Sequence, residues 1–133
     1  MIMFMMNRTD RYRLLLLIEL AGVRGGSIQV AEISRRRGIP TAYLAQLVAD
    51  LSRRGIIAAR RGPNGGVRLA LDPGEVPLDD LFAAPAPANL ASPALSQLQE
   101  RLGAAWGEAT SALTLQDLLR WERSAYGQPE YVI

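Results

Sequence analysis

The chain has 133 residues, 49% of them hydrophobic, which suits one folded domain with an added element. It contains no cysteine and no histidine, which excludes disulfides, thiolate nucleophiles, imidazole bases and the commonest ligands of zinc and iron–sulfur centres. Within a net charge of +2, twelve arginines against four acids give residues 1–70 a charge of +8, while residues 71–133 carry −6, so we expect the N-terminal half to meet a polyanion.

Residues 1–6 are apolar, but no basic residue precedes them and no small-residue cleavage site follows, so they do not resemble a signal peptide. This run of six residues and the apolar run Leu14–Ile18 are both far shorter than the roughly 20 residues that cross a bilayer. We therefore expect a cytoplasmic protein without membrane contacts.

A first helix is expected over residues 12–21, where nearly every residue is apolar, so this helix should be buried on more than one side. Thr9 or Asp10 would cap its start, and Gly22 would end it. A short second helix is expected over residues 30–36. Its inward residues would be Val30, Ala31 and Ile33.

A third helix is expected between Thr41 and a stop at Gly55. Its apolar residues follow the i, i+3, i+4, i+7 spacing of a single buried stripe. They are Leu44, Leu47, Val48 and Leu51. Two helices joined by a tight turn at Gly38, the second of them amphipathic, match the helix-turn-helix pattern.

Two short strands are expected at residues 56–60 and 67–71, and the residues between them have the composition of a hairpin tip. A hairpin that directly follows a helix-turn-helix is typical of the wing of a winged domain. A brief helix is expected at 77–83. The predicted fold class is therefore mainly α with a small β-hairpin wing, and the winged helix-turn-helix domain is assigned to residues 1–83.

Residues 84–92, which are rich in alanine and proline, are interpreted as a linker. Ser92 and Pro93 suit the cap and first position of a long helix whose apolar residues alternate three and four apart, as in a heptad seam. The seam residues are Leu95, Leu98, Leu102, Ala105, Ala109 and Ala112, with Trp106 and Leu113 beside them.

A last short helix is expected after a capping box formed by Thr114 and Asp117. We assign residues 93–123 to dimerisation helices, because the long helix exceeds what the small winged domain needs, and residues 124–133 to a loose tail. The first helix is expected to add to the same pairing surface. The alternative is that the seam packs inside one subunit. The candidate dimerisation residues are Leu95, Leu98, Leu102, Ala105, Trp106, Ala109 and Leu113.

The third helix exposes small residues opposite its apolar stripe, which would let its backbone approach base edges in a DNA major groove. The candidate major-groove residues are Thr41, Ala42, Tyr43, Ala45 and Gln46. Among them Gln46 can form two hydrogen bonds with an adenine, whereas the Tyr43 hydroxyl also suits a phosphate. Arg53, Arg54 and Arg60 are candidate contacts to the DNA backbone. The alternative is an ordinary solvent-facing surface.

The hairpin tip combines glycines with arginines, and this combination suits a narrow, A·T-rich minor groove. The candidate minor-groove residues are Arg61, Gly62, Asn64, Gly65 and Arg68. A hairpin with merely exposed charges is the alternative. A phosphate-cradling nucleotide loop is set aside, because neither G-x-G-x-x-G nor G-x-x-x-x-G-K-[ST] occurs.

In order and spacing, these segments resemble the Rrf2 family of winged helix-turn-helix transcription regulators. The segments that carry the resemblance are TDRYRLLLLIELA (9–21), ISRRRGI (33–39), YLAQL (43–47), GII (55–57), RGPNGGVRL (61–69) and LTLQDL (113–118). The resemblance implies a bacterial homodimeric regulator, expected to be a repressor on a palindromic operator. Residues 41–54 would enter the major groove and residues 61–68 the minor groove of double-stranded DNA.

Family members that hold an iron–sulfur cluster carry three cysteines between the wing and the long helix, where this chain has none, so we expect a cluster-free member with no cofactor and no metal. Many relatives have glutamate before the recognition glutamine, whereas Ala45 stands there in this chain, so their operator does not transfer. A small molecule or partner protein is expected to act near the linker and Trp106.

Two other classes of function compete with the DNA-binding hypothesis. A protein–protein adaptor would use the winged domain as a docking module, and its binding would respond weakly to salt, unlike binding to DNA. An enzyme is disfavoured, because the remaining candidates are scattered carboxylates such as Asp79 and Asp80, which diverge when they are adjacent on a helix.

Overall fold

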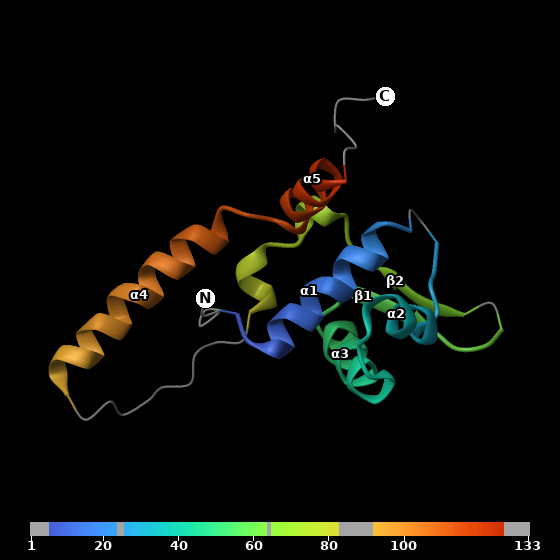
Figure 1. Ribbon diagram of the computed structural model, residues 1–133, viewed down its shortest axis with the longest axis horizontal. Helices are drawn as coiled ribbons and strands as arrows, with labels where there is room; N and C mark the ends of the chain where they lie inside the picture. The colour runs from blue at the N-terminus through green and yellow to red at the C-terminus, as the bar shows by residue number, and fades with distance from the viewer. Residues whose placement is uncertain (1–5, 24–25, 64, 83–91, 127–133) are drawn as a thin grey trace.

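The computed structural model describes residues 6–23, 26–63, 65–82 and 92–126. Its helices are α1 (Arg8–Ala21), α2 (Val30–Arg37), α3 (Thr41–Arg53), α4 (Pro93–Ser111) and α5 (Leu115–Ala125). Two strands, β1 (Ile57–Arg60) and β2 (Gly66–Leu69), form an antiparallel hairpin, and two 3₁₀ turns follow it, η1 (Pro73–Glu75) and η2 (Leu78–Leu81). The first three helices, the hairpin, the turns and α5 gather into one body, from which α4 extends (Figure 1).

The core of this body is built around α1, whose leucines face several elements at once. Leu16, Leu17 and Leu20 are buried, and they pack in one cluster with Leu44 and Leu51 of α3. The expected stripe of α3 is confirmed, since Leu44, Leu47, Val48 and Leu51 are all buried. Most of the leucine residues of α1 are buried in the core of their own subunit, and only Leu15 and Ile18 among its leucine and isoleucine residues stay partly exposed. The surface that this helix can offer for pairing is therefore smaller than expected.

The start of α1 differs from the expected position. Asn7 caps the helix, accepting a 2.8 Å hydrogen bond from the Asp10 backbone N–H, while the Asp10 side chain reaches back to the Asn7 N–H. Asp10 is therefore the third residue of a capping box and not the cap itself. Gly22 ends the helix as expected.

The second helix also departs from expectation in one side chain. Ile33 is fully buried and Val30 packs partly buried against the core, as expected, but Ala31 is exposed, so the inward assignment of Ala31 was wrong. A helix of only two turns presents few residues to the core, and the small side chain of alanine gains little from burial. The helix extends to Arg37 and ends at Gly38, which has the left-handed φ of 67° that glycine adopts without strain.

The hairpin pairs Ile57 with Leu69 and Arg60 with Gly66 at its two ends. Its outer edge is extended by Ile28, which exchanges two 2.9 Å backbone hydrogen bonds with Val67. Each strand is one residue shorter than expected, and β2 begins one residue before the expected 67 and ends two residues before the expected 71. The helix expected at 77–83 is the 3₁₀ turn η2. The neighbouring 3₁₀ turn, η1, was not expected.

The C-terminal helix α5 docks onto the winged body through backbone hydrogen bonds. The Leu78 N–H donates to the Leu113 carbonyl, and the Leu115 N–H donates to the Val76 carbonyl, each at 2.9 Å. The expected capping box is present, with the Thr114 N–H donating to Asp117 at 2.9 Å. The helix continues to Ala125, so its last two residues lie in the segment 124–133 that was expected to be a loose tail. Residues 127–133 lie outside the described part of the chain.

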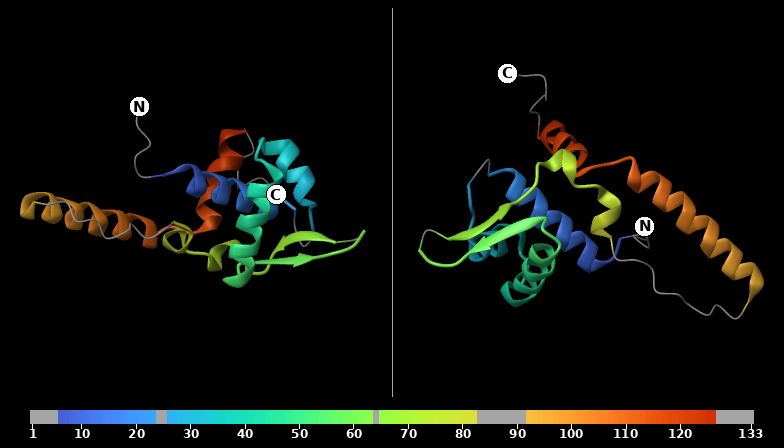
Figure 2. Two further views of the ribbon diagram at one scale, coloured as in Figure 1. Left: turned by 90° about the horizontal axis from the view of Figure 1, so that it is seen from below. Right: turned by 180° about the vertical axis from the view of Figure 1, so that it is seen from behind.

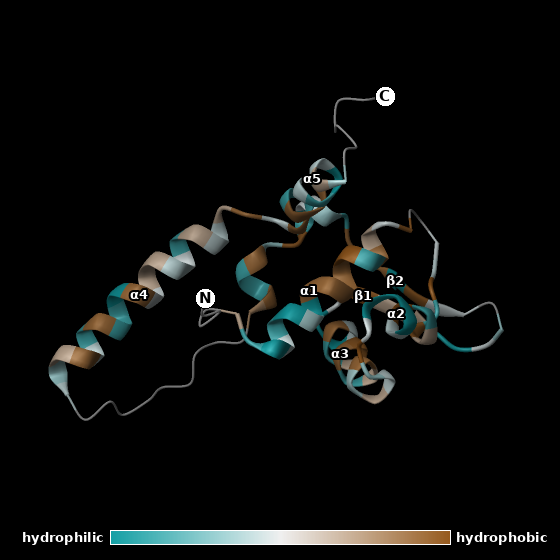
Figure 3. Cartoon of the chain, viewed as in Figure 1, coloured by the Kyte–Doolittle hydropathy of each residue, from teal (hydrophilic) through white to brown (hydrophobic). Residues whose placement is uncertain are grey.

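The long helix α4 begins as expected at Pro93, with the Ser92 hydroxyl accepting from the Leu95 N–H. Viewed from below, α4 and the hairpin extend in opposite directions (Figure 2). Leu95, Leu98 and Leu102 are 49%, 51% and 47% exposed, so the seam does not pack inside the subunit. Figure 3 shows that α1, inside the body, is largely hydrophobic, whereas α4 mixes hydrophobic and hydrophilic residues along its length. None of the helices in the described part is long and apolar enough to span a bilayer.

Candidate nucleic-acid interface

The exposed face of α3 carries most of the side chains expected to approach base edges. Thr41, Ala42, Ala45 and Gln46 are exposed, while the opposite face is held in the core. The Thr41 hydroxyl donates to Ser34 of α2 at 3.3 Å, which ties the beginning of α3 to the preceding helix. A helix fixed on one face and lined by short side chains on the other can lie deep in a groove.

Tyr43 lies at the junction of α1 and α3 and is partly buried. Its hydroxyl is hydrogen-bonded to that of Thr9, and its ring meets the Tyr12 ring edge-on, with centroids 5.4 Å apart. A hydroxyl held this way can still contact a phosphate, but it is poorly suited to reach a base. Sequence reasoning missed Thr9, because 34 residues separate it from Tyr43 and no local pattern links them.

The two arginines at the end of α3 differ in how many contacts their side chains make within the subunit. Arg53 is exposed and makes one long ion pair with Asp50, at 3.5 Å. Arg54 makes a 3.2 Å ion pair with Asp50 and donates a 2.7 Å hydrogen bond to the Asp80 carbonyl of η2. Arg54 therefore anchors η2 to α3, and Arg53 is the better placed of the two for a phosphate.

The tip of the hairpin presents arginines on a tight turn. Arg60, Arg61, Gly62 and Pro63 are exposed, and the Gly65 N–H donates to the Gly62 carbonyl at 2.9 Å; Asn64 lies outside the described residues. Arg60 and Arg61 form no ion pair with any other residue that the structure describes. Arg68 pairs with Ala58 in the hairpin, farther from the tip than expected.

Gln29 braces the hairpin, a role that sequence reasoning missed. Its side-chain amide donates a 2.7 Å hydrogen bond to the Gly65 carbonyl, 36 residues away. A side chain at Gly65 would overlap the Arg60 carbonyl, so the turn requires glycine there. The brace and the close backbone approach hold the arginine-bearing tip in one position.

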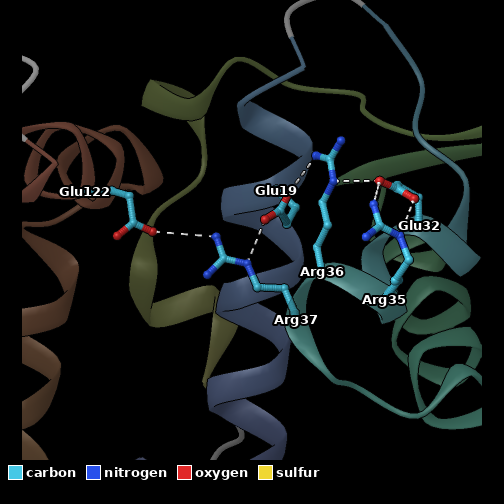
Figure 4. A network of polar contacts seen from close by, with 6 residues as sticks. All are labelled: Glu19, Glu32, Arg35, Arg36, Arg37 and Glu122. Atoms are coloured by element: carbon cyan, nitrogen blue, oxygen red, sulfur yellow. Dashed lines mark hydrogen bonds and ion pairs between the residues drawn. The ribbon is translucent and has the colours of Figure 1, made fainter.

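Three arginines of α2 are engaged in an ion-pair network (Figure 4). Glu32 pairs with Arg35 and Arg36, and Glu19 of α1 pairs with Arg36 and Arg37. Hydrogen bonds from Arg35 and then Arg36 hold the pKa of Glu32 below its ordinary value, so the interaction persists at neutral pH and is lost as the pH falls through that lowered pKa. The ion pairs of Arg36 and Arg37 with Glu19 therefore tie α2 to α1.

A helix-turn-helix with an exposed second helix, followed by a braced hairpin with arginines at its tip, defines a winged helix-turn-helix protein. Residues 6–120 match the Rrf2 family, described as an iron-dependent transcriptional regulator. The chain belongs to the Rrf2 family, as the resemblance indicated.

Named relatives agree with this membership. The chain is 37% identical over 75 residues to the HTH-type transcriptional regulator IscR of Aliivibrio salmonicida, covering 56% of this chain and 45% of the relative. It thus spans about half the length of the curated relatives it matches. The structure is similar to Staphylococcus aureus CymR (TM-score 0.73, 32% identity, 85% of this chain and 96% of that one). Its fold also matches T. potens IscR (TM-score 0.75, 24% identity, 90% and 88%).

The family is described as iron-dependent, but this chain lacks the residues that usually bind iron. The chain has no cysteine and no histidine, so neither thiolates nor imidazoles can hold an iron centre. Within the described residues, aspartates and glutamates form no group of three or more that could hold a metal ion. The residues of this chain therefore do not fit the familiar iron–sulfur site.

Proposed function

We propose that the protein is a sequence-specific DNA-binding transcription regulator that acts without an iron–sulfur cluster, with repression as the expected outcome. The observation that carries this proposal is the exposed face of α3 beside a hairpin whose Arg60 and Arg61 have no ion-pair partner among the described residues. An arginine without an intramolecular partner is available to a phosphate or to the negative potential of a narrow minor groove.

The proposed roles of the side chains follow from their positions. Thr41, Ala42, Ala45 and Gln46 would read base edges in the major groove, and Tyr43, Arg53 and Arg60 would contact the backbone. Arg61 and Gly62 would enter the minor groove. Arg68 would contribute from the base of the hairpin.

The proposed assembly is a homodimer on a palindromic site. The exposed leucines of α4 form a stripe that a second copy of the same helix can cover. Nineteen residues give a helix of about 28 Å. Trp106 packs edge-on against Phe82 of its own subunit, with centroids 4.9 Å apart, and Leu113 packs against the subunit core, so the pairing surface centres on Leu95, Leu98 and Leu102.

Replacing Gln46 with alanine is expected to cost about 1–3 kcal/mol of binding free energy and to relax specificity at one base pair, because a two-bond contact to a base is lost. Binding of a selected operator and its single-base variants, measured by fluorescence anisotropy, checks this. Ala49→Ser, an exposed change one turn farther along α3, serves as the control. A uniform loss over all variants would contradict the base-reading role of Gln46.

Replacing Arg61 with alanine should weaken binding to many sequences, and most to operators with A·T-rich flanks, where a narrow minor groove attracts arginine. The dependence of affinity on salt should also become shallower by about one released counterion. Titrations from low to moderate salt measure both effects. If the affinity of the wild-type protein hardly changed with salt concentration, its binding would not depend on arginine–phosphate contacts. That outcome would refute the DNA-binding proposal and favour the adaptor function.

A further inference from the structure

The helix α4 is attached to the body of the subunit near its C-terminal end. From Pro93 to Ala105 nearly all of its residues are exposed. Farther along, Trp106 is partly buried and Thr110 is 5% exposed. The exposed part of the helix extends away from the body (Figure 1). The direction in which α4 presents its leucine stripe is therefore set by the contacts of its last two turns.

The contacts of this end of α4 converge on the 3₁₀ turn η2. The Trp106 ring meets the ring of Phe82, the residue that follows η2, with centroids 4.9 Å apart and an angle of 80° between the planes. The N–H of Leu78, the first residue of η2, donates a 2.9 Å hydrogen bond to the carbonyl of Leu113, which follows α4. The turn is itself held in place, because Leu78 and Leu81 are buried in the core.

The helix proposed to read bases, α3, is tied to the same turn. Arg54, which directly follows α3, donates a 2.7 Å hydrogen bond to the Asp80 carbonyl. Arg13 of α1 donates to the Leu81 carbonyl, which fixes the other end of η2. One short turn is thus bound to α3 on one side and to α4 on the other. The position of η2 therefore determines how α3 is placed relative to α4.

This placement matters in the proposed homodimer on DNA, and the inference rests on that proposed function. Two copies paired through α4 hold their α3 helices at one separation, and this separation selects the spacing of the two half-sites. Successive base pairs lie about 3.4 Å apart, so a shift of each α3 by a few ångströms is enough to favour a different spacing.

We propose that Phe82 and Trp106 are positioning residues, whose ring contact fixes the separation of the two α3 helices and so sets the half-site spacing of the operator. Neither side chain has to touch DNA for this role. An edge-on ring pair suits it, because such pairs have a preferred geometry that two flexible aliphatic side chains lack. The choice of operator thus depends on residues outside both the exposed face of α3 and the leucine stripe of α4.

Spin labels on α3 test the positioning role without DNA. The chain has no cysteine, so Ala49→Cys places a single label on the exposed face of α3 in each protomer. Double electron–electron resonance on the full chain should give one narrow distance distribution. Adding Phe82→Leu should widen it about twofold or move its centre, because a core loses its unique packing before it loses its stability. Phe82→Tyr, which keeps the ring, and Trp121→Leu, which changes an exposed tryptophan of α5, should leave the distribution narrow.

Trp106→Leu is the second variant, because it removes the same ring contact from the other side. It should widen or move the distance distribution as Phe82→Leu does. Both residues are only partly buried, so both variants should fold. Sedimentation should show that Phe82→Leu stays dimeric, since the leucine stripe is untouched. Distributions as narrow as that of the wild-type background, with the same centre, would overturn the positioning role, and so would a monomeric Phe82→Leu.

Operator duplexes whose half-sites are moved apart or together by one base pair at a time test the consequence for DNA binding. Wild type should lose about tenfold or more in affinity at the first change, because the second half-site no longer fits. Phe82→Leu should lose about threefold or less, or prefer another spacing, with unchanged affinity for an isolated half-site.

Two results separate the possible failures. A Phe82→Leu variant with the same sharp preference for the same spacing as wild type would overturn the role in operator choice. Failure of wild type to bind any duplex would refute the proposed function, and the distance distributions would still decide whether Phe82 and Trp106 position α3.

Discussion

Replacing Leu98 with glutamate is expected to convert the proposed homodimer to a monomer and to weaken operator binding by about 100-fold or more. Leu98 is half exposed at the middle of the apolar stripe of α4, so in the proposed homodimer the new charge would face the second copy of the helix. Loss of pairing removes the gain in affinity that comes from binding two half-sites at once. Analytical ultracentrifugation measures the assembly, and fluorescence anisotropy with an operator duplex measures the binding.

The control for this change is Gln97→Glu, which adds the same charge on the same helix but off the stripe. It should stay dimeric and bind normally. Because Leu98 is not part of the subunit core, the circular dichroism spectrum of the Leu98→Glu monomer should retain its helical signal. A Leu98→Glu variant that sediments as a dimer with unchanged DNA affinity would show that the pairing surface lies elsewhere.

Replacing Asp10 with alanine is expected to destabilise the fold by about 3–5 kcal/mol of unfolding free energy. Asp10 and Arg13 are 4% and 5% exposed, and they form a 3.2 Å ion pair inside α1. Arg13 also donates to the Leu81 carbonyl, so this pair fixes η2 against α1. Removing the carboxylate would leave a buried guanidinium group without its counter-charge, and Asp10 would no longer complete the capping box. Urea unfolding at one protein concentration measures the loss.

The double variant Asp10→Ala/Arg13→Met separates the charge from the packing. Methionine fills part of the volume of arginine without a charge, so most of the lost stability should return, apart from about 1 kcal/mol for the weakened helix cap. Glu32→Ala, which breaks exposed ion pairs, should have a much smaller effect than Asp10→Ala. A single Asp10→Ala variant as stable as wild type would contradict the importance of the buried pair.

Most of the helices follow from near neighbours in the sequence. The apolar spacing of α3, the left-handed glycine at Gly55 and the caps at Ser92 and Thr114 all depend on residues within about one or two turns of each other. Such local signals are readable because the hydrogen bonds that close a helix end span only a few residues. The errors arose where two local signals competed, as at the start of α1, where Asn7 is the cap and Asp10 is its partner.

The candidate interface was predictable in its residue types but not in its contacts. Exposure of Gln46 and Ala45 follows from the helical period, since they lie opposite the buried stripe. The tethering of Arg54 to Asp80 and the hydroxyl pair of Thr9 and Tyr43 do not, because these partners come from separate elements. Which arginine is free for a phosphate is therefore a property of the packing.

The sequence by itself indicated a winged helix-turn-helix without cysteine ligands, because composition and short-range periodicity encode those features directly. The Rrf2 family was indicated by the resemblance of its segments in order and spacing, and the family match over residues 6–120 shows it. Only the tertiary structure decided that the leucines of α1 are buried in the core, that the leucine stripe of α4 is exposed, and that Arg68 and Arg123 line the same pocket. These outcomes depend on the packing of segments far apart in the chain, where burial of apolar surface selects the arrangement and local hydrogen bonds carry no information about it.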